Sequence, residues 1–210
     1  RFVLLCTGSR PHLPPITGLD PATVLTSENL FTLTAPPTSI AIVGGGPMGV
    51  EMAQALQRLG VTTTVFQRAR TLLPREEPAL VEQLTEQLRA EGVQVHCTAD
   101  VRSIEGHPTA GFEVHAVVGD DATSVHVEVG GVLIAAGRTP NCEQLGLEEL
   151  GIEVTERGVR VDARGRTAVR TVYAAGDVAG RRLLTNSAGY EGVRAVRDMF
   201  FPGKGSLDAA

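Results

Sequence analysis

The central part of the chain switches between strand-like and helix-like spacing of its apolar residues. The strand-like runs cover residues 39–43, 61–66 and 93–96, and the helix-like segments cover residues 47–59 and 78–91. Leu80, Leu84 and Leu88 recur at four-residue spacing in the second helix, and Gly60 and Gly92 are expected to end the two helices. Strands that alternate with helices in this way predict an α/β fold with a parallel sheet.

Residues 100–129 follow a different pattern, in which apolar and polar residues alternate. The alternating runs at residues 112–118 and 125–129 are separated by a turn signal at residues 119–121. We therefore expect an antiparallel β-meander, inserted into the parallel unit and exposed to solvent on one face. Residues 131–136 show no alternation, which is typical of a strand buried on both faces.

Two less regular segments flank this region. Residues 1–36 contain a strand-like run at 2–6, a proline-rich loop and a short helical signal at 27–30. The double proline at residues 36–37 is the clearest linker signal. Near the other end, a strand is expected at 171–175 and an amphipathic helix at about 187–200. These patterns suggest three segments, at residues 1–36, 37–142 and 143–210.

Charge and cysteine content narrow the class of protein. The formal net charge is −5 and the basic residues are scattered, so we expect no nucleic-acid or anionic-membrane partner. No signal peptide or membrane-spanning run is evident, and Cys6, Cys97 and Cys142 lack metal-ligand spacing. A soluble, cytoplasmic protein without a metal site is therefore expected. Because Arg1 directly precedes a strand-like run, we expect a piece of a longer protein.

The most specific motif is a glycine turn between the strand at 39–43 and the helix after it. Gly44, Gly46 and Gly49 have the G-x-G-x-x-G spacing, which permits a tight turn, approach to a pyrophosphate and close helix–strand packing. The free N–H groups and dipole of the helix favour an anion at this point. The motif predicts a Rossmann-like dinucleotide site; a turn that only packs is the alternative.

Four stretches, at residues 6–11, 43–51, 136–141 and 174–177, together resemble the pyridine nucleotide–disulfide oxidoreductase family. This family of flavoproteins includes glutathione reductase, dihydrolipoamide dehydrogenase and mercuric reductase. The resemblance implies an NAD(P)-binding domain at residues 37–142, with parts of an FAD-binding domain at 1–36 and 143–210. Residues 73–79 and 200–203 are most similar to the mercuric reductase branch.

The preferred nicotinamide cofactor is predicted from charge. An NAD site places a carboxylate at the end of the second strand, where this chain has Gln67 followed by Arg68 and Arg70. No acid would repel a 2′-phosphate, and either guanidinium could bind it. We predict NADPH, with Arg68 as the main contact because it matches the NADPH-dependent relatives. An ordinary solvated turn in an NADH-binding protein is the alternative.

The resemblance also implies roles in the first turns of this helix. In the family, the glutamate at the position of Glu51 reaches toward the flavin–nicotinamide contact and pairs with an upstream lysine, so Glu51 is the candidate catalytic residue. Stabilisation by the helix dipole is the simpler account of Glu51. Pro47 and Met48 are expected beside the cofactor. Several relatives carry an aromatic lid over the nicotinamide pocket at the position of Pro47, and proline cannot act as one.

The remaining motifs imply contacts with FAD. The family aspartate matched by Asp177 binds the ribityl chain, although a local Asx turn would also explain it. Thr185 belongs to a segment before a helix whose N-terminus faces the flavin in the family. The other residues implied in cofactor binding or in the turn between the cofactors are Thr7, Gly8, Gly137, Arg138, Asn141 and Gly176.

The resemblance implies an FAD-dependent enzyme that passes hydride from NADPH to FAD and electrons to a cysteine pair. That pair is expected upstream, and a dimerisation domain with a catalytic histidine is expected downstream, so the chain alone should be inactive. The five histidines are expected in loops or in the meander, facing solvent. The acceptor is a small molecule or a metal ion, and the full protein is a homodimer. The alternatives are a dihydrolipoamide dehydrogenase-like NAD enzyme, a non-catalytic nucleotide-binding or redox-sensor module, and an interaction domain that uses the exposed meander face.

Overall fold

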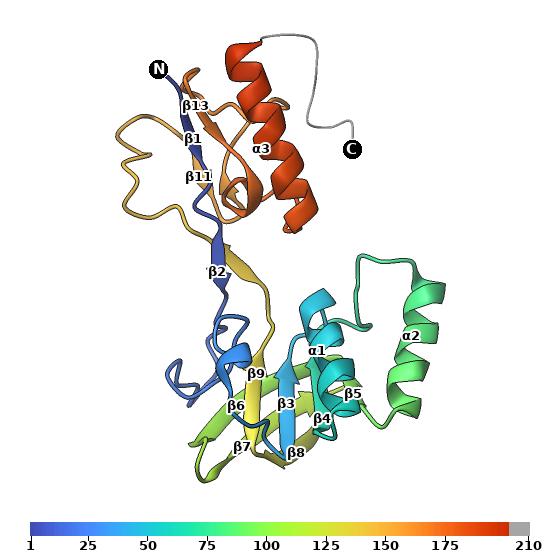
Figure 1. The fold of residues 1–210 in the computed structure, drawn as a ribbon. Coiled ribbons are helices and arrows are strands. Elements are labelled where there is room, and N and C mark those ends of the chain that lie inside the picture. The colour runs from blue at the N-terminus through green and yellow to red at the C-terminus, as the bar shows by residue number, and fades with distance from the viewer. Residues whose placement is uncertain (202–210) are drawn as a thin grey trace. The chain divides into compact units, whose positions relative to one another are not determined.

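In the computed structural model, which describes residues 1–201, the chain divides into two units. One unit comprises residues 1–10 together with the segment from residue 138 onward, and the other comprises residues 11–137 (Figure 1). Strands β2 (Ser9–Pro11) and β10 (Arg138–Pro140) pair with each other and contain the residues at which the chain passes between units. No helix of the described chain has the length and apolarity to cross a membrane.

The unit of residues 11–137 is built on a four-stranded parallel sheet with the strand order β5-β4-β3-β9. Its strands are β3 (Ser39–Val43), β4 (Thr62–Gln67), β5 (Gln94–Cys97) and β9 (Gly131–Ile134). All four expected strands, and their parallel pairing, are therefore confirmed. The connecting helices are α1 (Pro47–Arg58) and α2 (Pro78–Ala90). A proline at the first position of each helix suits a turn that has free N–H groups.

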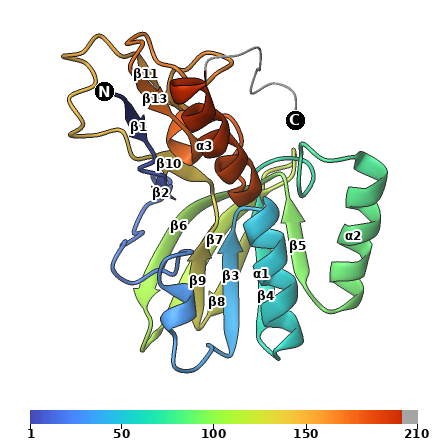
Figure 2. The same ribbon diagram turned by 45° about the horizontal axis from the view of Figure 1, so that its top comes forward.

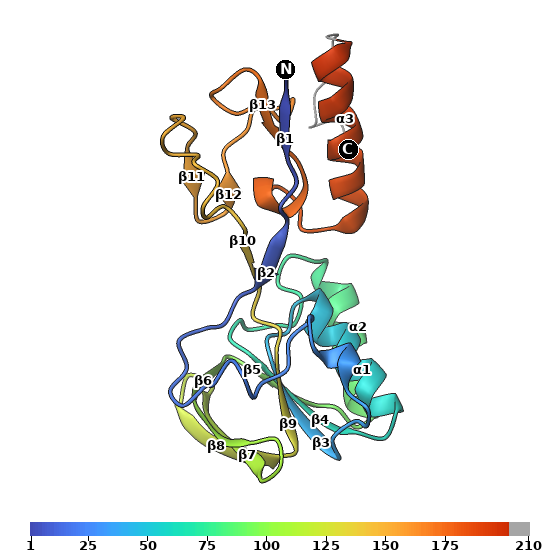
Figure 3. The same ribbon diagram turned by 60° about the vertical axis from the view of Figure 1, so that its left-hand side comes forward.

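The two faces of this sheet are covered by different elements, as Figure 3 shows. Ile40 and Ile42 of β3 pack with residues of α1 and α2, whereas Ala41 and Val43 pack with residues of the meander. This alternation follows from the two-residue period of a strand. The meander consists of β6 (Ala99–His107), β7 (Gly111–Val118) and β8 (Thr123–Val129). It is antiparallel, as expected, and its outward-facing residues are exposed.

The segment of residues 11–36 belongs to this same unit, which differs from the expected boundary at residue 36. Val24 and Leu30 are buried in its core, and the backbone of Leu25 bridges to Leu133 of β9. These contacts bring the segment into the unit, although its proline-rich sequence is typical of a linker. The expected helix at 27–30 is instead a single 3₁₀ turn, η1 (Leu30–Thr32).

The second unit has a smaller core around a parallel pair of strands, β1 (Val3–Leu5) and β13 (Val172–Ala174). Helix α3 (Thr185–Phe200) lies beside this pair in Figure 2, and Ala195 and Met199 of α3 pack with Tyr173. The 3₁₀ helix η2 (Gly176–Ala179) follows β13 directly. A short antiparallel pair, β11 (Val154–Thr155) and β12 (Gly158–Val159), completes the unit.

The leucine spacing in α2 does not mark its buried face, and one expectation about a histidine was wrong. Leu80 of α2 is 63% exposed, whereas Val81 and Leu88 are buried, because a helix of 3.6 residues per turn places positions 81 and 88 on one face. His96 lies in β5 rather than in a loop or the meander, and its half-buried ring stacks on Phe66 at 5.3 Å between centroids.

The contrast between two leucines of α2 provides a matched test of this packing. Leu88→Ala should lower the free energy of unfolding of the sheet-containing unit by about 2–5 kcal/mol, because it leaves a cavity in a closed core. Leu80→Ala removes the same atoms from an exposed position and should change stability by less than about 0.5 kcal/mol. Denaturant unfolding monitored by circular dichroism measures both; equal losses would contradict the observed helix orientation.

Candidate functional site

The glycine turn between β3 and α1 has a separate steric requirement at each glycine of the motif. Gly44 has φ +116°, and a side chain there would overlap the Ala135 carbonyl group. A side chain on Gly49 would overlap the Gly44 carbonyl oxygen. At Gly46, in contrast, no described atom beyond its two neighbours in the chain lies within 4 Å of the place that a Cβ would take. Two glycines are therefore required by the fold, and the third leaves open space at the start of α1.

The turn is held in place by the end of β4. The Gly44 N–H donates to the Phe66 carbonyl at 2.8 Å, and the Gly45 N–H donates to Oε1 of Gln67 at 3.2 Å. Nε2 of Gln67 donates to the Thr71 carbonyl at 3.1 Å, so this buried amide links the turn to the following loop. These bonds give Gln67 a structural role that the sequence did not predict. Its contact with a cofactor stays a prediction.

Three charged side chains near this turn have no partner within the described part of the chain. Arg68 and Arg70, which follow β4, are exposed and form no ion pair or hydrogen bond there. Glu51, at the fifth position of α1, is likewise exposed and unpaired among the described residues. Pro47 is exposed and Met48 is half-buried against the core. The two guanidiniums are therefore available to an anionic ligand.

The other unit contains a cavity of about 520 Å³. It is lined by Cys6, Gly8, Arg138, Ala175, Gly176, Asp177, Leu183, Thr185 and Ala188. Five residues predicted to bind a cofactor therefore lie around one space, although they come from four separate stretches of sequence. Thr7 does not line this cavity, because its hydroxyl group donates to the Asn141 carbonyl at 2.7 Å. Gly137 belongs to the other unit, where its carbonyl accepts from the His12 N–H.

Asp177 lies at the edge of this cavity with its charge compensated. Its Oδ2 accepts a hydrogen bond from the Ser9 hydroxyl at 2.5 Å and lies 3.5 Å from Nε of Arg138. Arg138 in turn donates to the hydroxyl and the carbonyl of Ser9, both at 2.6 Å. Since the carboxylate is only 23% exposed, these contacts supply the partner that its burial demands.

Glu191 is an acidic residue near Asp177 that the sequence analysis did not single out. It is 5% exposed on α3, and its Oε2 accepts a hydrogen bond from the Gly176 N–H at 2.8 Å. The Glu191 carboxylate thereby positions the turn that carries Asp177. The sequence does contain a signal for it: Glu191 is the one acidic residue on a helix face whose other residues, at positions 188, 195 and 199, are small or apolar.

The turn after β10 makes another contact that the sequence analysis did not predict. Arg10 donates from both terminal nitrogens to the Glu143 carboxylate, at 2.6 and 3.0 Å, and also to Oδ1 of Asn141. These hydrogen bonds lower the pKa of Glu143 to about 2. Asn141 also donates to the Thr7 carbonyl at 3.0 Å, so the loop after β1 and the turn after β10 are held together.

A family model described as pyridine nucleotide-disulphide oxidoreductase matches residues 2–192. The chain belongs to this family. The resemblance inferred from the four sequence stretches is thereby confirmed.

Curated relatives carry three different enzyme names at nearly equal similarity. A glutathione reductase of Burkholderia cepacia is 35% identical over 97% of this chain and 44% of its own length. A dihydrolipoyl dehydrogenase of Bacillus subtilis is 34% identical over 91% of this chain and 40% of its own length. A mercuric reductase of Shigella flexneri is 34% identical over 93% of this chain and 34% of its own length. The chain therefore spans less than half of these relatives, and the expected mercuric reductase branch is not distinguished.

Solved structures support the same fold. The HOCl-induced flavoprotein disulfide reductase RclA from Escherichia coli superposes with a TM-score of 0.85 at 31% identity, over 99% of this chain and 46% of that one. Members of this family are FAD-dependent and use NAD(P)H. The space at Gly46 fits the approach of a dinucleotide phosphate, and the cavity beside Asp177 has the size typical of a small-molecule site.

The glycine turn permits a test in which two similar substitutions have different effects. Gly49→Ala should destabilise the sheet-containing unit by about 1–3 kcal/mol, because the new methyl group overlaps the Gly44 carbonyl. Gly46→Ala enters open space and should cost less than about 1 kcal/mol, mainly from weaker capping of α1. Thermal unfolding compares the two variants, and an equal loss would exclude this assignment of steric roles.

The Arg10–Glu143 contact predicts a titration that nuclear magnetic resonance can follow. The Glu143 pKa of about 2 should rise toward 4.5 in Arg10→Ala, because the charge-assisted hydrogen bonds are lost. Since the folded-state pKa is depressed, the pair stabilises the protein above about pH 4.5, and this contribution is lost as the pH falls through about 2. Arg160→Ala, which removes another exposed arginine of this unit, is the control and should leave the Glu143 pKa unchanged.

Proposed function

We propose that this chain is the NADPH-binding portion of an FAD-dependent pyridine nucleotide–disulfide oxidoreductase. The observation that carries the proposal is the open turn at Gly46, together with two unpaired guanidiniums after β4. An NAD-type site would have a carboxylate at the end of β4. This position is occupied by Gln67, whose side-chain amide is already hydrogen-bonded to Gly45 and Thr71. The charges at this edge of the sheet thus favour a 2′-phosphate.

Each group of residues has a defined role in this proposal. The Gly44–Gly49 turn and the free N–H groups of α1 hold the pyrophosphate, and Arg68 binds the 2′-phosphate. Asp177, positioned by Ser9, Arg138 and Glu191, holds the ribityl chain of FAD. Glu51 is exposed in the second turn of α1, where it can orient the reacting groups. The bound cofactors supply hydride transfer, and the chain supplies binding and orientation.

The final electron acceptor is proposed only as a class. The named relatives act in disulfide, lipoamide or mercuric ion chemistry, and their identities to this chain, 34–35%, favour none of these over the others. We propose a small-molecule or metal-ion acceptor and a homodimeric full-length protein. An NADH-linked, dihydrolipoyl dehydrogenase-like enzyme is the second candidate, favoured by the similarity to a relative of that name.

Calorimetric titration with NADPH and NADH tests both the site and the preference. NADPH should bind about 10- to 150-fold more tightly than NADH, the range expected for one good charge-assisted contact with the phosphate. Arg68→Ala should abolish most of this difference and leave NADH binding unchanged. The matched control is Arg89→Ala, which removes an exposed arginine from the last turn of α2.

Each other outcome of this titration has a distinct meaning. Equal binding of the two nucleotides would retain the dinucleotide site and refute the role of Arg68. If neither nucleotide bound a folded protein, the glycine turn would be architectural only. Loss of the preference in Arg89→Ala as well would show that general positive charge, rather than a specific guanidinium, determines the choice.

A further inference from the structure

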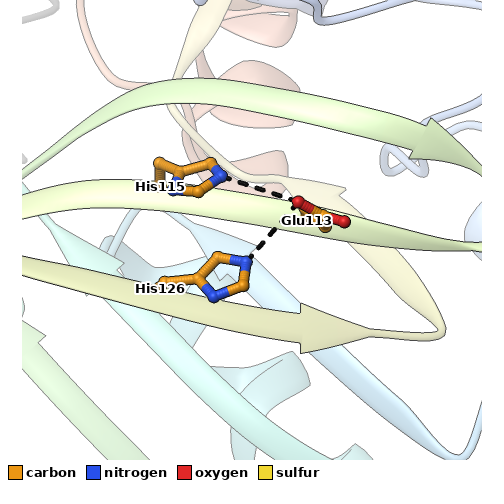
Figure 4. Close-up of side chains that lie close together, drawn as sticks. All are labelled: Glu113, His115 and His126. Carbon is orange, nitrogen blue, oxygen red and sulfur yellow. Dashed lines mark ion pairs between the residues drawn. The ribbon is translucent and has the colours of Figure 1, made fainter.

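Three side chains on the exposed face of the meander bring potential metal ligands together (Figure 4). Nε2 of His115 lies 3.8 Å from Oε2 of Glu113, and Nε2 of His126 lies 3.7 Å from the same oxygen. One ligand atom from each residue lies within 4.8 Å of the others. None of the three takes part in the proposed nucleotide chemistry.

The strand pairing determines this arrangement. His115 on β7 is directly opposite His126 on β8, and Glu113 lies two residues before His115 on the same face of β7. The two imidazole rings are stacked, with centroids 4.4 Å apart and planes at 18°. Because the backbone ladder holds the strands in register, the three side chains are already close together without a ligand.

The groups have no better partner among the described residues. Separations of 3.7 and 3.8 Å are too long for hydrogen bonds, and no group of the described chain donates a hydrogen bond to either imidazole. Glu105 and Glu128 stand opposite Glu113 on the two neighbouring strands, and neither forms an ion pair with a lysine or arginine of the described chain. Like charges directly opposite each other destabilise a sheet, and a bound cation would relieve this repulsion.

We propose that Glu113, His115 and His126 form a surface binding site for a divalent transition-metal ion, for which Zn²⁺ is the probe. Two imidazoles and one carboxylate suit Zn²⁺ and related ions, whereas Mg²⁺ prefers oxygen ligands. An ion with ligand distances of about 2.0–2.2 Å keeps its ligand atoms about 3.4 Å apart in tetrahedral geometry. Rotation of these exposed side chains, which must also tilt the two stacked rings toward a common point, would bring the ligand atoms to this separation. Water would complete the coordination.

The experiment is a calorimetric titration of the full chain, purified without a histidine tag, with Zn²⁺ and separately with Mg²⁺. Zn²⁺ should bind at one site and perturb the imidazole signals of His115 and His126 in nuclear magnetic resonance spectra, whereas Mg²⁺ should not. The double substitution His115→Ala and His126→Ala should weaken Zn²⁺ binding at least about tenfold, and Glu113→Gln should also weaken it. His107→Ala, another exposed histidine of the meander, is the matched control.

Circular dichroism confirms that each variant is folded, since all the substituted side chains are exposed. The proposal is overturned if Zn²⁺ does not bind, or if binding persists in the double variant at the original affinity. Binding that leaves both imidazole signals unchanged would point to the free cysteines and would also overturn it. None of these outcomes depends on nucleotide binding, so the proposed function is tested separately.

Discussion

The unit of residues 11–137 depends on one close backbone contact, between the Gly44 carbonyl and Gly49. A Cβ on Gly49 would overlap the Gly44 carbonyl oxygen, so α1 can begin directly after β3 only because this position is glycine; Gly44 needs to be glycine for a separate reason, the nearby Ala135 carbonyl. This places the free N–H groups of the first helical turn beside the open space at Gly46. The same contact that permits the sharp turn therefore also creates the place where an anion can bind, and fold and candidate site share one cause.

The two candidate cofactor regions differ in how their charges are satisfied. Around the cavity of the second unit, Asp177, Arg138 and Ser9 bond to one another, and buried Glu191 holds the adjacent turn. These groups are organised before any ligand arrives, which reduces the cost of binding an uncharged chain of hydroxyl groups. Beside the glycine turn, in contrast, Arg68 and Arg70 are exposed, and no acidic partner in the described chain neutralises their charge.

Particular elements show how far local patterns predict structure. The strands expected at 39–43 and 131–136, the second observed as 131–134, and the alternation in the meander were correct, because burial of apolar side chains enforces a two-residue period in strands. The segment of residues 11–36 groups with the sheet-containing unit rather than ending at the expected boundary, because its apolar side chains, which include Val24 and Leu30, are recognisable as core residues only when the surfaces that cover them are known. The leucines at four-residue spacing in α2 do not all face the core, because positions four residues apart drift around a helix.

The sequence by itself determined the family, the parallel sheet with its inserted meander and the place of the glycine turn, because spacing and periodicity are local properties. Only the tertiary structure decided which polar groups meet. Ser9 reaches Asp177 across 168 residues, Gly176 finds its acceptor on α3, and Glu113, His115 and His126 converge through strand register. Such contacts depend on distance in space, and a sequence carries that information only through the fold that packing of the apolar core selects.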